Sequence, residues 1–146
     1  MPLKGNSFVF YFLAMLIFGI SSLGFCAKDT ATPPPNFPPE IVEKVLNEPK
    51  VLVFLHPEIP GRVPVVISGV VLQSKFTPSV FGQPVRVVQS GMETESPIFE
   101  FIDFKIEKNR AMVETRYKVE GIHGTFKFKR GRNGEWKLVF SDVREN

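Results

Sequence analysis

Asp103 is the residue in this sequence that comes closest to a catalytic group. It lies in the run "PIFEFIDFKIE", where strand alternation places Asp103 on the same face as Phe99 and Phe101. If both faces of that strand are covered, Asp103 is a partly buried carboxylate with a raised pKa, and such a group can act as a general base. Tyr117, on the next predicted strand, and His56, at the end of another, could complete a catalytic pocket.

The same strand allows a simpler interpretation of Asp103. Asp103, Lys105 and Glu107 occupy three alternate positions, and a row of charges at this spacing is typical of a solvated strand face. The pattern favours a surface position for Asp103. We therefore predict that the protein has no catalytic residues and is not an enzyme.

The sequence contains no GxSxG, GxGxxG, P-loop, HExxH or CxxC motif. A zinc site would have to be assembled from His56, Glu58, His123 and Asp103. Their spacing does not indicate that they meet, and His123 falls in a predicted hairpin turn, "GIHG". We therefore expect neither a metal ion nor a cofactor.

Basic side chains are concentrated towards the C-terminus. Residues 105–146 carry eleven Lys and Arg against six Asp and Glu, and the stretch "KFKRGR" places four cations near one predicted hairpin tip. The four are Lys127, Lys129, Arg130 and Arg132. They predict a site for an anionic partner such as lipid headgroups, polysaccharide or an acidic protein surface. The alternative is a solvated sheet face on which Glu114 and Glu120 are cross-strand partners of the cations.

Residues 1–26 have the three parts of an export signal. Lys4 supplies a positive start, a hydrophobic run follows, and small residues close the segment. We predict a cleaved signal peptide here and a periplasmic or secreted domain. Two alternatives stay open: residues 5–27 are long enough to be an uncleaved membrane anchor with the domain outside the cytoplasm, and Cys26 could carry a lipid. Phe25 disfavours lipidation, because the residue before a lipidated cysteine must enter a narrow peptidase pocket.

A proline-rich segment, residues 27–39, predicts an extended linker between the signal and the folded part. A single folded domain is then expected over residues 40–146. It opens with a predicted short helix over residues 38–50, where Ile41 and Val45 lie at helical spacing on one apolar side.

The rest of the domain is predicted to be strands. They are expected over residues 50–56, 63–73, 84–89, 97–107, 110–120, 125–130 and 135–141. The Asn-Gly pair in "GRNG" is typical of a tight hairpin turn. We predict an α+β fold in which one short N-terminal helix packs on a mainly antiparallel, meander-like β-sheet. An all-β sandwich or barrel with a rim helix is the alternative.

Alternation also assigns the aromatic side chains of the last strands to the core, because Phe128, Trp136 and Phe140 share a face with other apolar residues. No exposed aromatic side chain is then left among the lysines. Since bases stack on exposed aromatic rings, nucleic acid is not expected as a partner.

The segment "AMVETRYKVEGIHGTFKFKRGRNGEWKLVFSDV" (111–143) resembles the closing strands of small cystatin-like and NTF2-like α+β domains. Those domains often show a strand, "EG", an aromatic strand, a glycine turn and then "WKL". NTF2-like domains open with several helices, and only one is predicted here, so the resemblance favours a cystatin-like arrangement. For an enzyme, it implies that Asp103, Tyr117 and His56 lie in a sheet-lined pocket.

Three hypotheses about function follow. The leading one is an exported, non-catalytic binding or structural module of the cell envelope, whose partner is an envelope protein or an anionic surface component. The second is a small enzyme of cystatin-like architecture that uses Asp103, Tyr117 and His56. The third is a binder of anionic surface ligands through the basic hairpin at residues 127–132.

Overall fold

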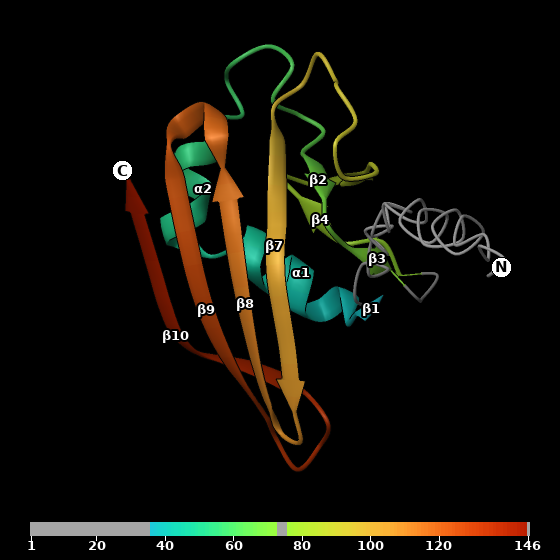
Figure 1. Cartoon of the computed structure of the whole chain (residues 1–146), viewed down its shortest axis with the longest axis vertical. Coiled ribbons are helices and arrows are strands. Elements are labelled where there is room, and N and C mark those ends of the chain that lie inside the picture. Colours follow the sequence, from blue (N-terminus) through green and yellow to red (C-terminus); the bar gives the residue numbers. More distant parts are fainter. Residues whose placement is uncertain (1–35, 73–75, 146) are drawn as a thin grey trace, which may run out of the picture. The chain divides into compact units, whose positions relative to one another are not determined.

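In a computed structural model of the chain, the structure describes residues 36–72 and 76–145 (Figure 1). The predicted signal peptide, Cys26 and residues 27–35 of the predicted linker lie outside the described residues. The end of the predicted linker is folded: Asn36–Phe37 form strand β1, and the Phe37 side chain is buried in the core.

Two short helices follow β1, namely α1 (Pro39–Leu46) and α2 (Pro49–Leu55). α1 confirms the predicted helix. Proline at its start suits a helix, because the first N–H groups have no intrahelical partner. Its buried side is formed by Ile41, Val42, Val45 and Leu46.

The strand predicted over residues 50–56 is wrong, because this run forms α2. Pro49 stands at the first helical position and starts the helix. Val51 and Leu55 are four residues apart and both buried, so they form an apolar stripe on one side of the helix. α2 ends at His56, which has a left-handed backbone with φ of 48°.

A mixed sheet forms the second layer, with the strand order β10-β9-β8-β7-β2-β6. Its antiparallel part consists of β7 (Ile98–Glu107), β8 (Arg110–Tyr117), β9 (Ile122–Arg130) and β10 (Trp136–Glu145), with the 3-10 turn η1 (Lys118–Glu120) between β8 and β9. This part confirms the predicted antiparallel meander. β2 (Val66–Ser68) runs parallel to both β7 and β6 (Arg86–Val87), so the sheet is mixed and open. The α+β fold class is confirmed, and the described residues contain two helices where the sequence predicts one.

The strand predicted over residues 63–73 is divided at Gly69. This glycine has φ of +82°, and a Cβ atom there would collide with the carbonyl group of Phe101, so the break requires glycine. The remaining strands are β3 (Val71–Leu72), which pairs with β1, and the hairpin of β4 (Ser79–Val80) and β5 (Gln83–Pro84).

Both helices cover one face of the sheet, which we call the inner face (Figure 1). Their apolar side chains pack there against residues of the meander, including Phe99, Val113 and Phe126. A polar contact joins α2 to β10. The Lys50 ammonium group donates a hydrogen bond of 2.8 Å to the Ser141 carbonyl oxygen. Among the described elements, no helix lies on the opposite face of β7–β10, which we call the outer face.

Candidate binding site on the outer face of the sheet

Asp103 lies on the outer face and not, as strand alternation predicts, beside Phe99 and Phe101. The register of β7 against β8 shifts between Phe101 and Asp103, so Ile102 is an extra residue in a β-bulge. The bulge turns the following side chains to the opposite face. Phe104 takes the inner position instead, opposite a buried residue of β8. The expected shared face is therefore wrong.

The surroundings of Asp103 are polar and open. Its side chain is 42% exposed and lies 3.2 Å from the Lys105 ammonium group. It also accepts a hydrogen bond of 2.8 Å from the backbone N–H of Phe104. A carboxylate in this position lacks the apolar cover that the general-base hypothesis requires.

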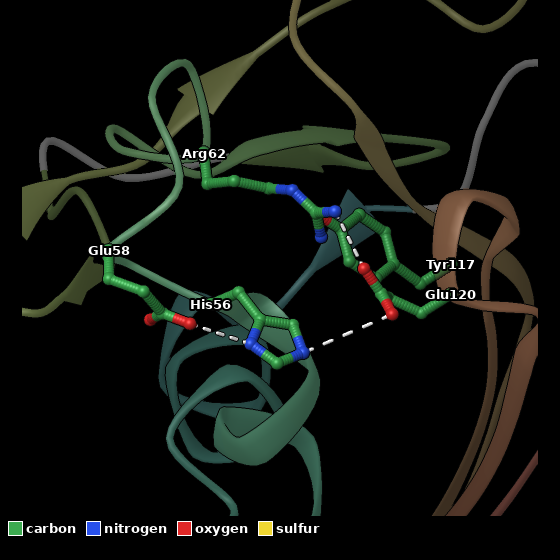
Figure 2. A network of polar contacts seen from close by, with 5 residues as sticks. All are labelled: His56, Glu58, Arg62, Tyr117 and Glu120. Carbon is green, nitrogen blue, oxygen red and sulfur yellow. Dashed lines mark hydrogen bonds and ion pairs between the residues drawn. The ribbon is translucent and has the colours of Figure 1, made fainter.

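Tyr117 belongs to a different environment, a polar network beneath the loop that follows α2 (Figure 2). Its ring is buried, and its hydroxyl accepts a hydrogen bond of 3.2 Å from Arg62 Nη1. The other amino group of Arg62 lies 2.6 Å from a carboxylate oxygen of Glu120, in η1. Only 9% of the Arg62 side chain is exposed, so this ion pair is largely screened from water.

The pKa values in this network follow from burial and pairing. Burial lowers the pKa of Arg62, but its hydrogen bonds with Glu120 and Tyr117 outweigh burial and hold the pKa above the usual value. Burial raises the pKa of Tyr117, against the opposing effect of the hydrogen bond from Arg62. At neutral pH the network therefore holds a guanidinium cation and a neutral phenol. It fastens the loop to the end of β8.

His56 lies at the edge of the same network (Figure 2). Its Nδ1 atom is 2.8 Å from the Glu58 carboxylate, and its Nε2 atom is 4.0 Å from Glu120. A backbone hydrogen bond and the contact with His56 lower the pKa of Glu58. His123, expected in a turn, lies on β9 with an exposed side chain. Within the residues that the structure describes, no three His, Cys, Asp or Glu side chains are grouped to hold a metal ion.

The outer face carries a cluster of paired charges near η1. The carboxylate of Glu100 accepts hydrogen bonds from Arg116 at 2.8 Å and 2.7 Å, and Lys118 lies 3.1 Å away. Burial raises the pKa of Glu100, but the hydrogen bonds from Arg116 and Lys118 outweigh burial and hold the pKa below its usual value. A cavity of about 620 Å³ adjoins this cluster, between Glu100 and the loop that contains Met92. We call this region, together with the Arg62–Glu120 network, the paired end.

At the opposite end, near the β7–β8 turn, cations surround a second cavity of about 460 Å³. Two cross-strand rows of outer-face residues form most of its wall. Across β7, β8 and β9 the rows are Lys105–Met112–Lys127 and Glu107–Arg110–Lys129. Val139, the extra residue of a second bulge in β10, completes the wall. We call Lys105, Arg110, Lys127 and Lys129 the basic cluster.

Three members of the basic cluster lack a counter-charge. Within residues 36–72 and 76–145, no carboxylate lies within ion-pair distance of Arg110, Lys127 or Lys129. Lys105, in contrast, forms an ion pair with Asp103. On its other side Lys129 faces Lys137 of β10, which adds a further cation to the row. The cavity therefore has a mainly cationic rim, on which Glu107 is the one carboxylate among the described lining residues.

The four sequence-predicted binding residues lie in three different places. Lys127 and Lys129 belong to the basic cluster, but Arg130 points to the inner side, with its guanidinium 5.7 Å from the centre of the Trp136 ring. Arg130 also donates to the Gly134 carbonyl oxygen at 2.9 Å, so it is engaged within its own hairpin. Arg132 lies exposed in the β9–β10 turn.

The bulge in β10 overturns another expectation. The register shifts between Leu138 and Phe140, so Phe140 is turned to the outer face and is 46% exposed. The Lys127 ammonium group lies 5.2 Å from the centre of the Phe140 ring. An aromatic side chain is thus exposed among the lysines, contrary to the alternation-based prediction.

Sequence reasoning missed Lys105, Arg110 and the apolar wall residues Met112 and Val139. The "EKNR" turn contains a signal that would have brought Lys105, Arg110 and Met112 together. A two-residue turn aligns Glu107 with Arg110, and the antiparallel register then aligns Lys105 with Met112. The bulge that brings in Val139 has no comparable signal in the strand "WKLVFSDV".

The described residues form an α+β domain with a polar sheet face that no described helix covers. The charges of this face are paired at one end and form the basic cluster at the other. No protein-family model matches the chain, and neither a curated protein nor a solved structure is significantly similar to it. The resemblance to cystatin-like domains therefore rests on the sequence of residues 111–143 alone. Among the described residues, no helix is both long and apolar enough to cross a bilayer.

Proposed function

We propose that this protein is a non-catalytic binding module that holds an anionic component of the cell envelope at the basic cluster. One observation carries the proposal: among the described residues, Arg110, Lys127 and Lys129 have no carboxylate within ion-pair distance, although they surround a cavity. Like charges held together without counter-charges repel each other, and an incoming anion relieves that repulsion.

The separation of the three candidate catalytic residues supports the non-catalytic part of the proposal. Asp103 is partly exposed on the outer face, whereas Tyr117 is buried on the inner face and hydrogen-bonded to Arg62. His56 is near the Tyr117 network but is paired with Glu58. The described positions of the three candidates therefore provide no common pocket.

The predicted export signal over residues 1–26 is the reason for placing this function in the envelope. Anionic headgroups, polysaccharides and acidic protein surfaces are the partners that a basic cluster would meet there. A cystatin-like arrangement of the helices and the meander is part of the same proposal, supported by the resemblance of residues 111–143 and by the helices lying on one face.

A pair of charge-reversal variants tests the proposal. The protein is passed over immobilised heparin and mixed with vesicles that contain anionic lipid. Lys127→Glu with Lys129→Glu is expected to weaken retention about tenfold or more at low salt, because charges near an anionic surface contribute about 1 kcal/mol each. The effect should shrink as salt rises and screens the charges.

The matched control reverses Lys44 and Arg86, which are exposed on α1 and β6 and have no ion pair among the described residues. This double variant changes the net charge by the same amount and is expected to bind within about twofold of the unaltered protein. If both double variants lose retention equally, binding follows net charge alone and the basic cluster is not a site.

A further inference from the structure

We infer that the ligand of the basic cluster is an amphipathic anion, with one carboxylate or phosphate group and a single hydrocarbon chain. This inference rests on the proposed function and narrows the ligand class. The cavity volume of about 460 Å³ lies in the range of small-molecule sites, which is roughly 300–1,000 Å³. Its wall combines two kinds of surface that such a ligand would cover together.

The first kind of surface is apolar. Met112 and Val139 line the cavity, and the aliphatic stems of the surrounding lysines add to them. Val139 is 61% exposed because the β10 bulge leaves it without a strand partner. Phe140, next to it, is also exposed. A hydrocarbon chain lying against these side chains would remove their apolar surface from water.

The second kind of surface is cationic, and its layout favours one anionic group rather than many. Arg110 can bind a carboxylate or phosphate with two parallel hydrogen bonds, and Lys127 and Lys129 lie on the neighbouring strand. Glu107 lies in the same row as Arg110 and also lines the cavity. A polyanion that crosses the whole row would meet the carboxylate of Glu107, whereas a single headgroup can bind on the cationic side.

Methionine methyl groups provide a direct reporter of binding. Met112 lines this cavity and Met92 lines the larger cavity at the paired end, so Met92 is an internal control in the same molecule. The protein is labelled with ¹³C at its methionine methyl groups, and the Met112 signal is assigned by its loss in Met112→Leu. Dodecanoate below its micelle concentration is expected to shift the Met112 signal saturably and to leave the Met92 signal unchanged.

Two further probes separate the two kinds of surface. Acetate carries the anion without the chain, and dodecyl maltoside carries the chain without the charge. Each is expected to bind at least about tenfold more weakly than dodecanoate, because each covers only one of the two surfaces. If acetate or dodecyl maltoside binds as tightly as dodecanoate, the ligand is not an amphipathic anion and the inference fails.

Variants of exposed valines give the matched test. Val139→Ser is expected to weaken dodecanoate binding about fivefold, because it removes apolar contact area. Val53→Ser changes a side chain of α2 that is 63% exposed and should leave dodecanoate binding unchanged. Equal effects of the two variants would contradict the assigned location.

The inference and the proposed function can fail separately. If heparin retention depends on Lys127 and Lys129 but dodecanoate does not shift Met112, the proposed function stands and the amphipathic ligand is overturned. If dodecanoate shifts Met112 but neither heparin nor anionic vesicles retain the protein, the cluster binds a small amphiphile, and the proposal of an envelope-surface partner is overturned.

Discussion

The two ends of the outer face contain similar side chains and differ in how their charges are paired. At the paired end, Glu100 lies within 3.1 Å of both Arg116 and Lys118. At the other end, the row Glu107–Arg110–Lys129–Lys137 places three cations side by side. Among the described residues no carboxylate, Glu107 included, lies within ion-pair distance of these cations. The first arrangement stabilises the fold, and the second leaves its charge available to a partner.

This difference shows why a count of charges is a weak guide to a binding surface. Lys118 and Arg116 contribute to the same positive total as Lys127 and Lys129, but both already form ion pairs with Glu100. The informative quantity is the charge that remains after the protein's own ion pairs are formed.

The largest expected effect is on stability at the paired end. Arg62→Met keeps much of the apolar stem but leaves Glu120 and the Tyr117 hydroxyl without their partner. Because Arg62 is largely buried and Glu120 is partly exposed, we expect the free energy of unfolding to fall by about 3 kcal/mol. Urea unfolding at pH 7 measures this change.

Arg132→Met, in the exposed β9–β10 turn, is the matched control and should change the free energy of unfolding by less than about 0.5 kcal/mol. If Arg62→Met is as stable as this control, the Arg62–Glu120 network does not stabilise the fold. The two ends would then not differ in the contribution of their charges to stability.

A smaller, pH-dependent effect is expected at Glu100. Its pKa is lower in the folded than in the unfolded protein, whose carboxylate has the ordinary value of 4.5. The ionised form therefore stabilises the fold above pH 4.5, and this contribution is lost as the pH falls through the folded-state pKa. Glu100→Gln should cost about 1 kcal/mol at pH 7, because the pair is partly screened by water.

Unfolding measured from pH 7 to pH 3 checks the sign of this effect. The stability difference between the unaltered protein and Glu100→Gln should narrow as the pH falls below 4.5. Glu114→Gln, on the same face and without an ion pair among the described residues, should not produce such a narrowing. A difference that stays constant with pH would exclude ionisation of Glu100 as its cause.

The sequence predicts the meander and the first helix because their patterns are local. Alternation over residues 110–117 and the "GRNG" turn are sufficient to indicate β8, β9 and β10. The run at residues 50–56 was assigned to a strand because a short apolar run is compatible with either a strand or a buried helix. β2 pairs with β6 and β7, which are distant from it in the sequence. No local sequence pattern predicts such pairing.

Only part of the candidate site can be predicted from the sequence, because only part of it lies on strands with regular alternation. Lys127 and Lys129 stand out as a basic stretch, and their direction follows from the regular alternation of β9. Asp103 and Phe140 were assigned to the wrong face because each follows a bulge. A single extra residue reverses every later side chain, and its position depends on packing across strands rather than on the strand's own residues.

The smallest expected effect has the opposite sign and is found at the basic end. Lys129 lies between Arg110 and Lys137, and like charges directly opposite each other on adjacent strands are destabilising. Lys129→Gln should therefore raise the free energy of unfolding by about 0.5 kcal/mol at low salt, and this gain should vanish near 1 M salt, where the Debye length is about 3 Å. Thermal unfolding at both salt concentrations measures it. A loss of stability in Lys129→Gln would show that the fold depends on this cation, so its charge could not be regarded as free for a ligand.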